Sequence, residues 1–368
     1  MSLGPSLNPA KIAEGSVVMR ATGPSLPPRR PDARLPMRRR ARVAFGVMGR
    51  AAVALAFLAL SAWTCLALWH QAGDDNRWRL AAVVAWAALL VFLARFAWSR
   101  TRLGLILIAA AFAAFGAWWL SIEPRLDRDW APDVARTVTG RIEGDVATLE
   151  NVRDFAWRDA ADAEERWKTE RYDLSQLTET DVILSYRGTE AIAHTLVSFG
   201  FSDGRRVVFS IEIRRETHEQ FSSLAGFFKT YELALIAAEE RDILYLRTNA
   251  RGERAYLYPL RLPKPAAAAL FRSYVETGDA LAREPEFYNT LTANCTTVAF
   301  DLARLIEPGI PSDWRILLSG YLPGYLADQG VLLWNMPLEA LRRRAEISTK
   351  AKAAPPGADY SEAIRREP

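Results

Sequence analysis

The chain contains two cysteines and three histidines, so few residues can supply thiol or imidazole chemistry. Cys295 comes directly before residues 296–306, whose apolar periodicity predicts an amphipathic helix. A thiol at a helix N-terminus lies near the positive end of the helix dipole, which favours the thiolate form. The neighbours Asn294 and Thr296 are polar, whereas the usual free cysteine is a small buried hydrophobic residue. Cys295 is therefore the candidate nucleophile.

A thiolate nucleophile needs a base or an imidazolium partner, and outside the apolar N-terminal region only His194 and His218 are available. His194 lies in 191–201, a segment rich in β-branched and aromatic residues that predicts a strand. His218 follows a charged segment that we expect to be an exposed loop. His194 is the better candidate for the base, and a purely structural role for it stays open.

A third group normally orients the imidazole through its other ring nitrogen. The turn sequence at 202–205 predicts a hairpin, which would place 206–216 beside the strand of His194. Glu212 is on this second strand and is the candidate orienting acid. It is equally suited to form a salt bridge with Arg214 or Arg247, so this reading stays open too.

The remaining segments of this region show both helical and extended patterns. We expect helices over 221–241 and 265–277, and strands over 242–249 and 254–260. The sequence has no glycine-rich phosphate loop, no GxSxG motif and no HExxH motif, and two distant cysteines do not make a Cys-based zinc site. We therefore expect no cofactor and no metal site.

Three stretches near the N-terminus are long and apolar enough to cross a membrane: 51–70, 80–98 and 103–122. The first and third carry no charged residue, and the second carries only Arg95. A helix of about 20 residues spans roughly 30 Å, the thickness of the hydrocarbon core of a bilayer. The chain is predicted to be a membrane protein with three transmembrane helices.

The distribution of arginine predicts the orientation of these helices. Seven arginines between Arg29 and Arg42 precede the first stretch, and further arginines separate the second stretch from the third. By the positive-inside rule, the N-terminus then faces the cytoplasm, and three spans carry the rest of the chain across the membrane. We expect a multi-pass protein of the bacterial inner (cytoplasmic) membrane whose C-terminal domain lies in the periplasm.

These patterns predict four regions. We expect a disordered basic cytoplasmic tail over 1–42, three transmembrane helices over 43–122, a periplasmic α+β domain of cysteine-enzyme type over 123–345, and a disordered tail over 346–368. Met37 is an alternative start for the chain.

The excess of basic residues lies almost entirely in the N-terminal tail. Residues 1–42 contain nine basic and two acidic residues, which leaves 38 basic and 41 acidic residues in the rest of the chain. The folded part is therefore slightly acidic, which argues against nucleic acid as a partner.

Five sequence blocks resemble a known family, the bacterial Lnb N-terminal periplasmic domain. In chain order, within about residues 140–330, they are AHTLVSFGF, VVFSIEIRRE, FFKTYELALIAAEERDILYLRTN, YLYPL and FYNTLTANCTT. The family is similar to the permuted NlpC/P60-like cysteine enzymes, so the resemblance implies a papain-like α+β fold. It also implies that His194 and Cys295 are the catalytic pair, with Glu212 at the position of the family's acid.

The family takes its name from a lipoprotein N-acyltransferase, and the resemblance implies the corresponding reaction here. Cys295 would attack an acyl ester of a membrane phospholipid with His194 as base, and the thioester would then acylate the N-terminal amine of a lipoprotein. Backbone amides at the start of the 296–306 helix are expected to stabilise the oxyanion.

Two other functions are compatible with the same residues. A cell-wall cysteine amidase or peptidase acting on peptidoglycan would use the same Cys295–His194 pair. An acyltransferase would differ in having a lipid-facing, apolar cleft, for which the aromatic segment 314–325 is a candidate. A non-catalytic membrane-anchored binding domain would tolerate replacement of either residue.

Overall fold

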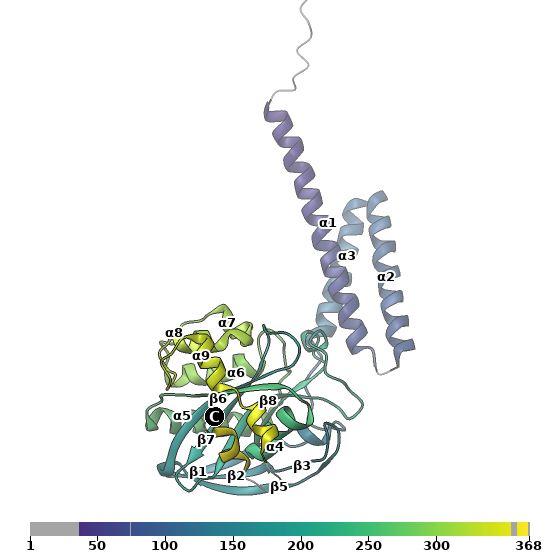
Figure 1. Cartoon of the computed structure of the whole chain (residues 1–368). Helices are drawn as coiled ribbons and strands as arrows, with labels where there is room; N and C mark the ends of the chain where they lie inside the picture. The colour runs from purple at the N-terminus through teal and green to yellow at the C-terminus, as the bar shows by residue number, and fades with distance from the viewer. Residues whose placement is uncertain (1–36, 74, 355–358, 367–368) are drawn as a thin grey trace, which may run out of the picture. The chain divides into compact units, whose positions relative to one another are not determined.

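The computed structural model describes residues 37–73, 75–354 and 359–366, with side chains from Met48 onward. It begins with three long helices, α1 (Met37–Gln71), α2 (Asn76–Ser99) and α3 (Thr101–Leu120) (Figure 1). Each contains a segment long and apolar enough to cross a membrane. The three predicted apolar helices are therefore confirmed. The chain divides into two compact units, and the division lies within α1, between Ala59 and Leu60. The second unit is Leu60–Pro368.

The boundary of the predicted N-terminal tail needs a correction. Residues 1–36 of the predicted tail 1–42 lie outside the described residues, but residues 37–42 belong to α1. Arginine is a good helix former, and 37–42 contain neither glycine nor proline, so the helix continues beyond the apolar stretch.

A mainly antiparallel sheet of eight strands follows the three helices. Its order is β1 (Thr139–Glu143), β2 (Val146–Arg153), β9 (Glu232–Ala238), β8 (Arg206–Arg214), β7 (His194–Phe201), β6 (Leu177–Tyr186) and β10 (Arg254–Pro259), and β5 (Trp167–Asp173) also pairs with β2. A separate ribbon joins β3 (Ala156–Trp157) to β4 (Ala163–Glu164). The predicted hairpin is confirmed, because β7 and β8 pair antiparallel across the turn.

Two predicted elements are wrong. The expected helix over 221–241 is a loop followed by strand β9, and the expected strand over 242–249 is α4 (Glu240–Tyr245) followed by a π-helical segment, η4 (Leu246–Ala250). Every residue of β9 is buried, so the strand lacks the alternation of polar and apolar residues that marks a half-exposed strand. A continuous apolar run of this kind cannot be told from a buried helix by its pattern alone.

Helices cover both faces of the sheet. On one face, α5 (Lys264–Arg283) packs its aromatic residues against the strands; the Tyr274 ring, for example, stacks on Phe209 at 4.9 Å between ring centroids. On the other face, Leu196 and Val208 share a core with Ile243 of α4 and with C-terminal residues such as Ile364. A mixed domain of strands and helices thus follows three apolar helices, as predicted.

Further helices lie C-terminal to α5. They are α6 (Cys295–Ile306), α7 (Trp314–Leu317), the 3-10 turn η5 (Ser319–Tyr321), α8 (Leu322–Asp328), α9 (Leu338–Ala345), α10 (Ser348–Ala353) and α11 (Tyr360–Arg365). The prediction of a disordered tail over 346–368 is wrong for its described residues, which include α10 and α11. Arg365 of α11 is 2.7 Å from both Asp181 and Glu240, so an ion-pair cluster with sequence-distant partners attaches this segment to the sheet.

Candidate functional site

His194 and Glu212 meet at one end of the sheet. Leu196 of β7 pairs with Ser210 of β8, so two residues further along this antiparallel pair His194 comes opposite Glu212. His194 Nε2 lies 2.7 Å from Ser210 Oγ and 3.2 Å from Glu212 Oε1. Ser210 donates its hydroxyl hydrogen to Glu212 Oε1 at 2.7 Å, which leaves its oxygen to accept from the Nε2–H of His194. This arrangement leaves Nδ1 of His194 for a second partner.

Cys295 is the first residue of α6, and the local sequence explains why the helix begins there. The side chain of Asn294 accepts hydrogen bonds from the backbone amides of Thr296 and Thr297, and the Thr297 hydroxyl accepts from the amide of Asn294. This capping box is a strong start signal for a helix. A contact of 2.8 Å between the hydroxyls of Thr195 and Thr296 joins α6 to β7. Cys295 is thereby held beside His194.

The charges of this pair support each other. Burial opposes the thiolate, but the positive charge of His194 and its hydrogen bond outweigh burial, and the pKa of Cys295 lies below its usual value. Burial and Arg247 oppose protonation of His194, whereas Glu212 and Cys295 favour it and raise the pKa of His194 to about 9. Between these two pKa values, the pair is a thiolate beside an imidazolium, the reactive form of a cysteine nucleophile.

Arg247 is a member of the site that the sequence interpretation named only as a possible partner of Glu212. Its guanidinium donates to Glu212 Oε1 at 2.7 Å and lies 3.5 Å from Glu253, which accepts from Ser185 at 2.6 Å. Burial opposes ionisation of Glu212, but His194 and Arg247 hold its pKa well below the usual value. Glu212 therefore contacts His194 and also forms the salt bridge with Arg247.

The expectation for the oxyanion site needs a correction. The backbone amides of Thr296 and Thr297 both donate to the side chain of Asn294, at 2.9 and 3.0 Å, so they do not point freely towards a substrate. Of the first three amides of α6, only that of Cys295 has no hydrogen-bond partner within the described residues.

The other candidate residues lie elsewhere. His218 is exposed in the loop after β8, with Nδ1 3.9 Å from Glu216. Cys65 lies in the apolar part of α1 and forms no disulfide. Among the described residues, no group of three or more His, Cys, Asp or Glu side chains is arranged to hold a metal ion.

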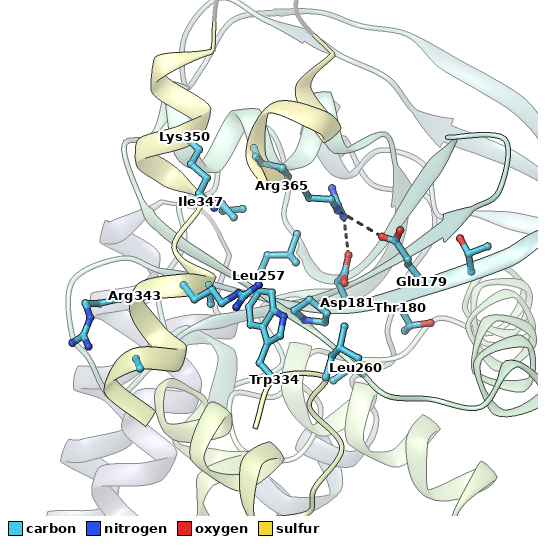
Figure 2. A pocket seen from close by; sticks show the side chains of 17 residues that line it. Glu179, Thr180, Asp181, Leu257, Leu260, Trp334, Arg343, Ile347, Lys350 and Arg365 are labelled. Atoms are coloured by element: carbon cyan, nitrogen blue, oxygen red, sulfur yellow. Dashed lines mark hydrogen bonds and ion pairs between the residues drawn. The ribbon is translucent and has the colours of Figure 1, made fainter. Parts of the chain in front are cut away.

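A cavity of about 790 Å³ lies apart from these residues, between the start of β6, the end of β10 and the C-terminal helices. Figure 2 shows Trp334 and Leu257 in its wall and Arg365 directed towards Asp181 and Glu179. None of Cys295, His194 and Glu212 lines it. The cavity therefore belongs to the contact between the C-terminal helices and the sheet.

Comparison with known proteins identifies the domain that contains the site. Residues 163–320 match the family model of the Lnb N-terminal periplasmic domain, and this stretch includes His194, Glu212, Arg247 and Cys295. None of the curated proteins and none of the solved structures compared with the chain matches it. Residues 163–320 of this membrane protein are thus an Lnb N-terminal periplasmic domain, which follows three helices of membrane-spanning type.

Proposed function

We propose that the protein is a membrane-anchored periplasmic cysteine acyltransferase that moves an acyl chain from a phospholipid to the N-terminal amine of a lipoprotein. The observation that carries the proposal is the thiolate-favouring contact between Cys295 and His194 inside an Lnb N-terminal periplasmic domain. The chain would cross the bacterial inner membrane three times, with its N-terminus in the cytoplasm. Anchoring would hold the site near two substrates that both reside in the bilayer.

In the first half-reaction, the Cys295 thiolate attacks the carbonyl carbon of a phospholipid ester. The amide of Cys295 stabilises the oxyanion of the tetrahedral intermediate. The carbon–oxygen bond to the glycerol then breaks, and the alkoxide takes a proton from the His194 imidazolium. The products are an acyl thioester on Cys295 and a lysophospholipid.

In the second half-reaction, the lipoprotein amine attacks the thioester carbonyl. Neutral His194 accepts the proton of the amine, the carbon–sulfur bond breaks, and the thiolate of Cys295 is restored beside an imidazolium. Glu212 fixes the ring orientation through Ser210, and Arg247 fixes Glu212. The residues therefore return to their starting protonation states after one cycle.

Exposed apolar residues beside the pair support a lipid substrate. Ser319 of η5 accepts a hydrogen bond from the Ala193 amide at 2.9 Å and donates one to the Ala193 carbonyl at 2.6 Å. This double contact holds η5 directly beside His194. Leu318, next to Ser319, and Tyr321, two residues after it, are exposed, as is Ile192. Solvent-exposed apolar side chains on the two segments that meet at Ala193, next to His194, favour an acyl chain over a peptidoglycan peptide as the first substrate.

The first test detects the thioester directly. Purified full-length protein in phospholipid nanodiscs should gain the mass of one acyl chain on Cys295, and neutral hydroxylamine should remove it. Cys295→Ala should abolish the adduct, whereas the matched variant Cys65→Ala should retain it. Absence of an adduct from both wild type and Cys65→Ala would overturn the first half-reaction.

The second test detects the product. The protein is expressed in a bacterium depleted of its own lipoprotein N-acyltransferase, and lipoprotein N-termini are analysed by mass spectrometry. A third acyl chain should appear with the wild type and disappear with Cys295→Ala. Cleavage of purified peptidoglycan that depends on Cys295, without added acyl chains, would replace the acyltransferase with a cell-wall amidase.

A further inference from the structure

The loop between β8 and β9, residues 215–231, exposes large apolar side chains. Phe221, Leu224 and Phe227 are 58%, 51% and 41% exposed, although the loop also contains the buried residue Phe228. An exposed cluster of this kind on a loop usually marks a surface that contacts another apolar phase. The contacts of the loop indicate what covers these three side chains.

Phe228 ties this loop to the apolar helices. It is 3% exposed and shares a small core with Ala67 of α1 and Phe115 of α3, and its ring centroid is 6.2 Å from that of Trp63. Trp63 precedes Gln71, the last residue of α1, by eight positions, or about 12 Å along the helix. The Phe228 ring also stacks on His70 at 5.3 Å, so Phe228 packs against α1 and α3 within the last turns of α1.

Polar contacts fix the same loop at the helix ends. Gln71 Nε2 donates to the carbonyls of Phe228 and Lys229 at 2.7 and 2.9 Å, and Lys229 Nζ donates to the carbonyls of Trp119 and Ile122 at 2.8 and 3.0 Å. Lys229 has φ of 54°, a left-handed conformation that residues other than glycine rarely adopt. Such a conformation persists where the surroundings hold it in place.

Chain connectivity gives an independent limit on the distance between the loop and the helices. The backbone amide of Arg125 donates to Glu232 Oε1 at 3.0 Å, and Glu232 begins β9 immediately after the loop. Arg125 is five residues beyond Leu120, the last residue of α3. Five residues span at most about 18 Å, so the end of the loop stays close to the end of α3.

The loop also contacts the segment that leads into the nucleophile. Thr290 Oγ1 donates to the Ser223 carbonyl at 2.8 Å, and the Thr290 amide donates to the Gly226 carbonyl at 3.3 Å. The Thr290 carbonyl accepts from the side chain of Asn294, the cap of the Cys295 helix, at 2.9 Å. Thr290 therefore contacts both the loop and Asn294, the residue that caps the helix of Cys295.

We propose that the β8–β9 loop inserts Phe221, Leu224 and Phe227 into the lipid leaflet on the domain's side of the membrane, next to Cys295. The occupant of the exposed surface is the acyl-chain region of the bilayer that holds α1 and α3. Aromatic and aliphatic residues at this depth match the composition of interfacial anchors. The inference rests on α1 and α3 crossing the membrane as proposed above, and not on the reaction at Cys295.

The test measures the depth of a fluorescent probe in the full-length chain. Phe227→Cys is made on a Cys65→Ser, Cys295→Ser background, labelled with an environment-sensitive dye and reconstituted in phosphatidylcholine–phosphatidylglycerol vesicles. The probe at 227 should emit at shorter wavelength, be quenched by nitroxide on lipid tails and be protected from aqueous iodide. The background lacks Cys295, so the outcome does not depend on acyl transfer.

Two further probes make the result decisive. Asp203→Cys lies in the turn at the opposite end of β8, about 30 Å from the loop, and its probe should be quenched by iodide and not by lipid nitroxide. Leu58→Cys, in the apolar part of α1, should be quenched by lipid nitroxide. Iodide quenching at 227 equal to that at 203, with 58 in lipid, would overturn the insertion alone. Iodide quenching at 58 would overturn the proposed membrane topology and the insertion together.

Discussion

Two buried clusters of charge lie along the same sheet, and they differ in what surrounds them. One joins Glu212 and Glu253 through Arg247, and the other joins Asp181 and Glu240 through Arg365. Each places one arginine between two carboxylates. Both therefore show the perturbed pKa values that are often taken as a sign of an active site.

The chemistry around each arginine separates the two clusters. The Arg247 cluster contacts His194 through Glu212, and His194 and Cys295 are only partly buried. The Arg365 cluster contains no nucleophile or imidazole and attaches α11 to the sheet. Paired buried charges thus hold segments together in both places, and only the first cluster tunes a group that a substrate can reach. Perturbed pKa values alone would not distinguish them.

The largest expected effect comes from breaking the structural cluster. Arg365→Ala leaves Asp181 and Glu240 buried without their shared partner, and removing one member of a buried ion pair costs about 3–5 kcal/mol of unfolding free energy. The exposed neighbour Arg366 supplies the matched control Arg366→Ala. Urea unfolding of the full-length protein in detergent, followed by tryptophan fluorescence, measures both variants. Equal stability of the two would show that the Arg365 cluster does not hold the C-terminal segment.

The next effect concerns the reactivity of the nucleophile. On a Cys65→Ser background Cys295 is the single thiol, and the positive charge of His194 lowers its pKa below the usual value, so the thiolate fraction at pH 7 exceeds that of an ordinary cysteine and decreases as the pH falls. His194→Ala removes the positive charge, so the thiolate fraction falls to the few per cent of an ordinary cysteine. Alkylation by iodoacetamide at pH 7 should slow about tenfold or more.

The matched control for that measurement is His218→Ala, which removes an imidazole outside the site. It should leave the alkylation rate at pH 7 unchanged. If His194→Ala and His218→Ala alkylate at the wild-type rate, the thiolate–imidazolium pair does not exist.

The candidate site could be predicted from the sequence better than the elements around it. The cap at Asn294 and the turn at 202–205 are local signals, so the helix start and the hairpin were predicted, and Cys295 and His194 were easy to single out because they belong to rare residue types. Glu212 was singled out because the predicted hairpin places its strand beside that of His194.

The missed features depend on distant contacts. Strand β9 is buried along its whole length and so has no diagnostic period. The C-terminal helices are ordered through Arg365, whose partners Glu240 and Asp181 are 125 and 184 residues away in the chain. No local pattern contains this information, and a charged, polar tail read by itself is typical of disorder.

The smallest expected effect sharpens the comparison between the two clusters. The negative charge of Glu212 helps to raise the pKa of His194 to about 9, against burial and Arg247. Glu212→Gln keeps an acceptor for Ser210 and removes the charge, so the imidazolium should be lost at a pH below about 9. Glu240→Gln, the same change in the Arg365 cluster, should leave the titration of His194 unchanged, because Glu240 contacts Ser198 and Arg365.

Because the chain has three histidines, NMR of protein labelled with ¹⁵N-histidine can follow each imidazole as the pH changes. If the titration midpoint of the His194 imidazole moves equally in Glu212→Gln and Glu240→Gln, Glu212 acts only through the overall charge of the domain. A midpoint that falls only in Glu212→Gln would assign Glu212 to His194 as its positioning residue. The difference in role between the two clusters then follows from direct contact with the imidazole, since the type of carboxylate and its pairing with arginine are the same in both.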